Sequence, residues 1–150
     1  MFAIKKDGAI DDVAVSDDEW ETLLSFASAD RVSLARRLRH GMSTRTLEAL
    51  DRARTINLAL LANHGLLDAT AWESAKAQGR TGRALSDLFV RYLRISKIAK
   101  RIWDDETAEK WLVRPNSALQ GEIPITLLDS DQGAQAVEVL LAQIEHGIPS

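Results

Sequence analysis

The sequence predicts an all-α protein, because apolar residues recur at helical spacing along most of the chain and strand-like alternation is nearly absent. Within 84–103, for example, Leu88, Tyr92 and Ile95 share one helical face with further apolar residues, as in an amphipathic helix. Alternation is confined to "FAIKK" and "IDDVAV" near the start, and these stretches are too short to build a sheet. We therefore expect a bundle of helices.

Four helices are predicted in the first half of the chain, at 16–29, 32–39, 44–65 and 67–79. Ser16 and Glu19 have the spacing of a capping box at the start of the first helix. Gly41 interrupts the chain between the second and the third helix. Gly65 and Gly79 are expected as C-caps, because glycine readily adopts the left-handed conformation that ends a helix.

Three more helices are predicted in the second half, at 84–103, 104–112 and 131–147. The helix 104–112 begins with acidic residues and stops before Pro115, because a residue that precedes proline is disfavoured in the α conformation. Ser130 or Asp131 is expected to cap the last helix, which Gly147 should end. No helix or strand is predicted between Pro115 and the last helix. That stretch contains turns and a short apolar patch.

The net charge of −3 conceals a strong asymmetry along the chain. Residues 1–30 carry a net charge of −6, residues 31–101 carry +10 and residues 102–150 carry −7. A basic block between two acidic blocks suggests that the middle of the chain meets a polyanion. Solvated helix faces are the alternative explanation for such charge runs.

Composition restricts the class of protein further. The chain contains no cysteine, which excludes a disulfide scaffold, a thiol nucleophile and a cysteine-ligated metal. The start, "MFAIKKDGAIDD", reaches acidic residues at once and is not expected to be a signal peptide. Charges interrupt every apolar stretch before it is long enough to span a membrane. We expect a soluble, cytoplasmic protein.

No arrangement of residues predicts a catalytic site. His40, His64 and His146 each stand beside a glycine at a predicted helix end or turn, where a histidine interacts favourably with the helix dipole. Paired acidic residues open several helices, where negative charge is stabilised. No phosphate-binding loop, nucleophile elbow or metal-ligand spacing is present. We therefore expect no enzymatic activity, no cofactor and no bound metal.

Residues 32–54, "VSLARRLRHGMSTRTLEALDRAR", have the outline of a helix-turn-helix. Ala35 would allow two helices to cross closely, Gly41 would form the turn, and the second helix would begin just after it. Side chains at the start and on the outer face of that second helix would contact bases and phosphates. The predicted DNA-binding residues are Arg36, Arg37, Ser43, Thr44, Arg45 and Arg52. The alternative is an ordinary helical hairpin with arginines on its solvent side.

The helix predicted at 84–103 has two further surfaces. A basic face would contact phosphates or cross a dimer interface; it consists of Arg91, Arg94, Lys97 and Arg101. The apolar face is larger than one short helix needs, and helix-turn-helix proteins commonly pair to read two half-sites. We therefore assign homodimerisation to Leu88, Phe89, Tyr92 and Ile95. The alternative places these four side chains in the chain's own core.

The last third of the chain contains the motif "WLVRPNSALQGEIPITLLDSDQGAQAVEVLLAQIEHG", residues 111–147. It resembles the toxin-binding domain of the Xre/MbcA/ParS family of antitoxins. That family has a helix ending in Trp-Leu, then Pro-Asn-x-Ala-Leu, a Gly, a Pro followed by two Leu, an acidic helix start with Gly, and a last helix ending Ile-x-x-Gly. The matching residues that we expect to shape the fold are Trp111, Leu112, Pro115, Asn116, Leu119, Gly121, Pro124, Leu128 and Gly133.

The resemblance covers roughly 85–150 well, and 30–84 resembles the family's Xre-type helix-turn-helix loosely. It implies an antitoxin that inhibits a RES-domain toxin, from a family of enzymes that consume NAD or use it to modify a target protein. The antitoxin would form a homodimer with two toxin-binding surfaces, assemble with the toxin into a complex of higher order, and regulate its own operon by binding operator DNA. Inhibition would occur by covering or plugging the toxin's NAD pocket with the final module and the free end of the chain. The residues of that end are Ile144, Glu145, His146, Gly147, Ile148, Pro149 and Ser150.

Three regions are therefore predicted along this bundle. They are an acidic N-terminal segment with one helix, 1–30, a basic helix-turn-helix region that binds DNA and dimerises, 31–104, and a small helical toxin-binding module, 105–150. A stand-alone helix-turn-helix regulator of transcription, in which the last module only dimerises, is the alternative function.

Overall fold

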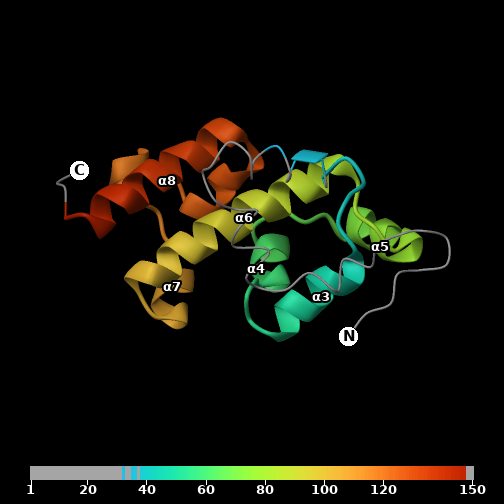
Figure 1. Cartoon of the computed structure of the whole chain (residues 1–150). Coiled ribbons are helices and arrows are strands. Elements are labelled where there is room, and N and C mark those ends of the chain that lie inside the picture. Colours follow the sequence, from blue (N-terminus) through green and yellow to red (C-terminus); the bar gives the residue numbers. More distant parts are fainter. Residues whose placement is uncertain (1–31, 33–34, 37, 148–150) are drawn as a thin grey trace. The chain divides into compact units, whose positions relative to one another are not determined.

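The computed structural model describes residue 32, residues 35–36 and residues 38–147, and these confirm the all-α fold class (Figure 1). In this part of the chain the only pairing of extended backbone is one antiparallel bridge between Ser43 and Arg80. The α-helices are α3 (Thr44–Arg52), α4 (Leu58–Asn63), α5 (Ala69–Gln78), α6 (Arg83–Ile102), α7 (Asp105–Leu112) and α8 (Asp131–Glu145), and the 3-10 helices are η2 (Ser117–Leu119) and η3 (Pro124–Asp129). The acidic segment 1–30, with the helix predicted at 16–29, lies outside the described residues.

The chain divides into two compact units. Of the described residues, those up to Ile56 and Ala69–Asp87 form the first unit. Asn57–Asp68 and the described residues from Leu88 onward form the second. This division runs through α6, whereas the sequence predicted a boundary between residues 104 and 105. The second unit thus contains α6 from Leu88 onward together with α7 and α8.

In the first unit, the turn before α3 is held by a segment almost forty residues away. The Met42 amide donates to Thr81 Oγ1 at 3.0 Å, and the Thr81 amide donates to the Met42 carbonyl at 2.9 Å. Arg80 donates from Nε to the His40 carbonyl at 2.6 Å and from Nη2 to the Gly41 carbonyl at 2.9 Å. A Cβ on Gly41 would collide with the Thr81 carbonyl, and Gly41 has a φ of +76°. The predicted glycine turn is therefore locked by tertiary contacts as well as by local conformation.

The single helix predicted at 44–65 is wrong, because the chain breaks between α3 and α4. Ala53 ends α3, and Arg54 adopts the left-handed conformation with a φ of +62°. Asn57 then begins α4, since its side chain accepts a hydrogen bond from the Leu60 amide at 3.2 Å. An asparagine in this position satisfies an amide that has no partner within the helix. Helical periodicity alone did not reveal this restart.

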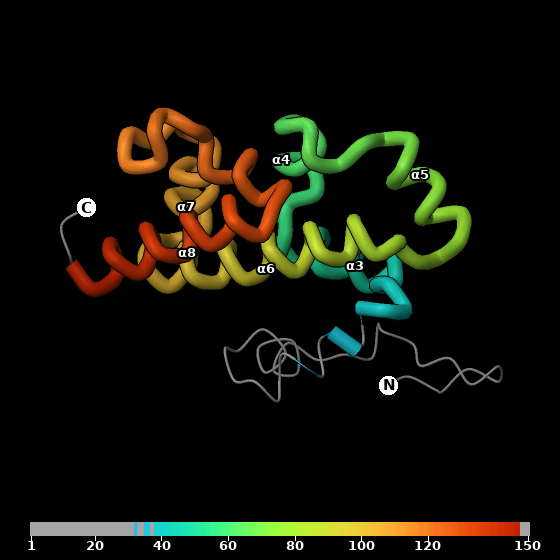
Figure 2. Tube along the Cα trace, turned by 90° about the horizontal axis from the view of Figure 1, so that it is seen from above, coloured from blue at the N-terminus to red at the C-terminus, as the bar shows by residue number. Residues whose placement is uncertain are grey.

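In the second unit, α8 runs alongside α6 in both views (Figures 1 and 2). Buried leucine and valine side chains of α8 contribute to the core, with Val137 and Leu141 fully buried. The Tyr92 hydroxyl of α6 accepts a hydrogen bond from the Asn57 amide at 3.1 Å, and Asn57 Nδ2 donates to Glu109 of α7 at 3.1 Å. These bonds join the start of α4 to α6 and α7.

No helix within the described ranges combines the length and the apolar character that crossing a membrane requires.

Candidate functional site

The C-terminal module begins with α7, which starts with acidic residues as the sequence predicted and is capped by Asp104. Asp104 accepts a hydrogen bond from the Thr107 amide at 2.7 Å. That backbone bond is the main cause that lowers the pKa of Asp104 below its ordinary value. At the other end of α7, the Trp111 ring lies 5.5 Å from the Trp103 ring, centroid to centroid, with a tilt of 31°. Tilted aromatic pairs at this distance stabilise packing, so Trp111 fixes α7 against the end of α6.

The Asn116 loop then reverses the chain within a few residues. Its side-chain oxygen accepts from the Ala118 amide at 2.9 Å, and its carbonyl accepts from the Gly121 amide at 2.9 Å. The Asn116 amide donates to the Glu122 carbonyl at 3.0 Å. Gly121 has a φ of +83°, which favours glycine because other residues are strained there. Asn116 and Gly121 therefore shape this loop.

The start of α8 is pressed against η3. Ser130 caps α8, because its hydroxyl accepts from the Gly133 amide at 3.0 Å. A Cβ on Gly133 would collide with the carbonyl oxygen of Leu127, so only glycine allows the two elements to approach this closely. Leu128 and Pro124 of η3 are buried. Together with the Asn116 loop, this contact positions α8 in the module.

A row of arginines on α6 meets a row of acids on α8. The acids are spaced by seven residues, Asp131, Glu138 and Glu145, so they share one face of α8. The pairs are Arg91–Asp131 at 3.3 Å, Arg94–Glu138 at 3.8 Å and Arg101–Glu145 at 3.1 Å. Arg91 Nε also donates to the Leu128 carbonyl at 2.7 Å. The predicted use of these three arginines against phosphates or a second copy is corrected, because intramolecular acids neutralise them.

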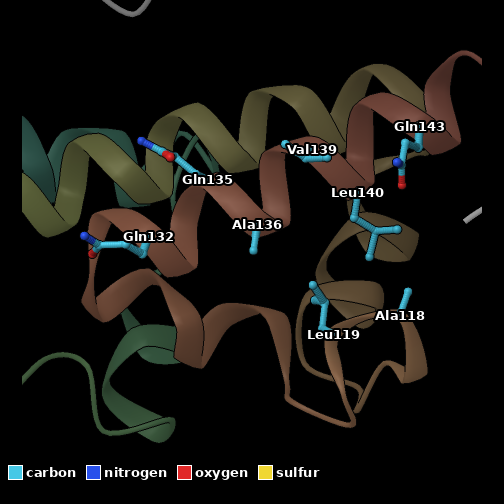
Figure 3. A pocket seen from close by; sticks show the side chains of 8 residues that line it. All are labelled: Ala118, Leu119, Gln132, Gln135, Ala136, Val139, Leu140 and Gln143. Atoms are coloured by element: carbon cyan, nitrogen blue, oxygen red, sulfur yellow. The ribbon is translucent and has the colours of Figure 1, made fainter.

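The opposite, solvent-facing side of α8 forms an open groove with η2 (Figure 3). Its volume is about 580 Å³, and it is lined by Ala118, Leu119, Gln132, Gln135, Ala136, Val139, Leu140 and Gln143. None of these side chains is charged. Val139 is 58% exposed, although it is a large apolar residue. The sequence interpretation missed this groove; its signal was an uncharged stripe at 132, 136, 139 and 143, spaced for one helical face.

The predicted DNA-binding residues do not share one environment. Ser43 and Thr44 are buried. As the N-cap of α3, the Ser43 hydroxyl accepts a hydrogen bond from the Thr46 amide. The prediction that both point into a DNA groove is therefore wrong. Arg45 and Arg52 are exposed and lie seven residues apart on α3, hence on one face. Arg36 is exposed and Arg37 lies outside the described residues.

Two other features of the predicted helix-turn-helix and dimer surface also differ. Ala35, expected at a close helix crossing, is exposed. The four residues assigned to homodimerisation are buried within the chain: Leu88 is 5% exposed, Phe89 0%, Tyr92 1% and Ile95 0%. Side chains that pack inside one chain cannot also cover a second copy. Their burial corrects the assignment of this face to a dimer interface.

The free end of the chain is described as far as Gly147. Ile144 is half-buried, and His146 and Gly147 are exposed after the last turn of α8. Glu145 is held by Arg101 through two hydrogen bonds of 3.1 Å, so its predicted availability to a partner's basic groups is corrected. Ile148, Pro149 and Ser150 lie outside the described residues.

The described residues contain no group of three side chains suited to hold a metal ion. No curated protein matches the chain. Residues 99–147 match the family model of the antitoxin Xre/MbcA/ParS C-terminal toxin-binding domain. The matched residues include α7, both 3-10 helices and α8. The match confirms the resemblance that the motif at 111–147 predicts, and it supports an antitoxin role for this chain through a segment similar to the toxin-binding domain of that family.

Proposed function

We propose that this protein is the antitoxin of a type II toxin–antitoxin system and that it inhibits a RES-domain toxin that consumes NAD. The observation that supports the proposal is the match of residues 99–147 to a toxin-binding domain. The matched segment is also a well-packed module, in which capping, the Gly133 approach and the ion pairs to α6 hold α8 in place. A rigid module can present a binding surface without losing much conformational entropy on association.

Inhibition would occur by occlusion of the toxin's NAD pocket with residues 144–150. Glu145 is already bound by Arg101, so His146 is the described polar side chain of this segment that would face basic residues of the pocket. Charge-assisted hydrogen bonds to arginine are shorter and stronger than neutral ones. In this proposal the protein has a regulatory role and carries out no reaction of its own.

Autoregulation through operator DNA belongs to the same proposal. Its support is the exposed face of α3 with Arg45 and Arg52, near the exposed Arg36 in sequence, within the basic block of the chain. Cations on one helix face can neutralise neighbouring phosphates. A homodimer with two toxin-binding surfaces is also proposed, on a surface other than the buried face of α6.

Co-expression tests the proposal. The full chain is produced together with the RES-domain protein encoded beside its gene, in cells that stop growing when that protein is produced alone. Restored growth and copurification of the two proteins are expected. A chain that purifies alone, leaves growth arrested and binds DNA in a salt-sensitive way would instead establish the stand-alone regulator.

A further inference from the structure

The surface of α8 is divided into three faces with different occupants. One apolar face, with Ala134, Val137 and Leu141, is buried in the core. A second face carries the acids that pair with α6 arginines. The third face is the uncharged groove with η2, which has no occupant among the described residues (Figure 3). Of these faces, the groove is the one still available to another molecule.

The chemistry of the groove differs from that of an ordinary solvated helix face. Helices that face water are usually covered with charged side chains, yet the groove is lined by glutamine, alanine, valine and leucine. Val139 is a β-branched residue at an exposed helical position, where helix propensity does not favour it. Charged residues are depleted in the centres of protein interfaces, because burying an unpaired charge is costly. The composition of the groove therefore suits burial by a partner.

We propose that this groove is the surface on which the toxin docks, which rests on the proposed antitoxin function. The groove lies entirely within residues 99–147, the segment that matches a toxin-binding domain. The toxin would place an apolar side chain over Ala136 and Val139. It would offer uncharged hydrogen-bonding groups, such as backbone amides and carbonyls, to Gln132, Gln135 and Gln143.

The position of the groove also assigns affinity and inhibition to two different parts of the module. The groove extends to Gln143, one residue before the segment 144–150 that is proposed to reach the NAD pocket. Docking on the groove supplies affinity, and the free end then supplies inhibition. The two contributions are therefore separable by mutation.

The decisive experiment places a charge in the groove and the same charge outside it. Ala136 and Ala142 are both exposed alanines of α8, but only Ala136 lines the groove. Binding of full-length Ala136→Glu and Ala142→Glu to the copurified RES-domain protein is measured by calorimetry. We expect Ala136→Glu to weaken the affinity at least about tenfold, because the glutamate would be buried without a partner. Ala142→Glu should bind like the wild type, and circular dichroism should show equal helicity for all three.

A second pair of variants, Val139→Lys and Ala142→Lys, tests whether the partner surface is uncharged. Loss of affinity for Val139→Lys alone supports an uncharged partner, since both signs of charge are then rejected. Equal affinity of Ala136→Glu and Ala142→Glu overturns the proposal while the antitoxin function stands. So does a wild-type dimer that Ala136→Glu converts to a monomer with unchanged toxin affinity, because a second copy then occupies the groove. Absence of any binding by the wild type overturns the antitoxin function itself.

Discussion

Arg101 and Glu145, forty-four residues apart in sequence, form a bidentate ion pair between the C-terminal ends of α6 and α8. Arg101 Nε and Nη2 donate to the two carboxylate oxygens of Glu145, each at 3.1 Å. The hydrogen bonds from Arg101 are the main cause that lowers the pKa of Glu145, and the same bonds raise the pKa of Arg101. The pair holds the last turn of α8, from which the free end of the chain emerges.

The first prediction concerns pH. Because the pKa of Glu145 is lower in the folded chain than its ordinary value of 4.5, the pair contributes stability above that value and loses it as pH falls through the folded pKa. Glu145→Gln should therefore lower the Tm slightly at pH 7 and leave it unchanged near pH 2. Thermal unfolding across this pH range measures the difference. Glu122→Gln, on an exposed glutamate, is the control, and an equal change in both variants would count against the ion pair.

A second prediction concerns the approach of α8 to η3. Gly133→Ala should reduce the free energy of unfolding by about 1–3 kcal/mol, because the new methyl group overlaps the Leu127 carbonyl and α8 must shift. The better helix propensity of alanine, worth about 1 kcal/mol at most, offsets part of this cost. Urea unfolding measures the change. Gly82→Ala, where a Cβ meets nothing within 4 Å, should stay within about 0.5 kcal/mol, and similar losses in both variants would contradict the close approach.

The third prediction tests DNA binding by α3. Arg45→Ala combined with Arg52→Ala should weaken the salt dependence of binding. The slope of log affinity against log salt concentration should fall in magnitude by about two, about one for each lost phosphate contact. Fluorescence anisotropy with a labelled duplex from upstream of the gene provides the measurement. Lys110→Ala removes an exposed cation from α7 and should leave the slope unchanged. An unaltered slope in the double variant would remove α3 from the DNA-binding surface.

A fourth prediction separates inhibition from docking. Deleting residues 147–150 should release NAD consumption in the complex, because the end of the segment 144–150 proposed to occlude the pocket is lost and residues 144–146 alone would not fill it. The deletion begins after the end of α8 at Glu145 and keeps the Arg101–Glu145 pair. Helicity and DNA binding should therefore remain. NAD consumption is followed at equal stoichiometry of toxin and antitoxin. If the truncated antitoxin still inhibits the toxin, the body of the module and not its end occludes the pocket.

Local features of the sequence determined most of the helices in the described part of the chain. The acidic start of α7 was predicted, and Ser130 is the one of the two predicted cap residues that caps α8. Pro115 follows the end of α7, as expected. The motif at 111–147 also indicated the toxin-binding domain whose family model matches residues 99–147. These signals are readable because a cap or an amphipathic period depends on residues within about one turn of the chain.

Tertiary contacts decided which side chains are available to a partner. Ser43 is buried beside Arg80, and Arg101 is neutralised by Glu145. These partners lie 37 and 44 residues away, so no local pattern specifies them. The burial of Tyr92 and the exposure of Val139 likewise depend on which elements pack together. The sequence by itself determined where most of the described helices form and end, apart from the break between α3 and α4. Only the tertiary structure decided which helix faces are buried in the core or engaged in ion pairs, because burial and charge pairing are properties of contacts between distant segments.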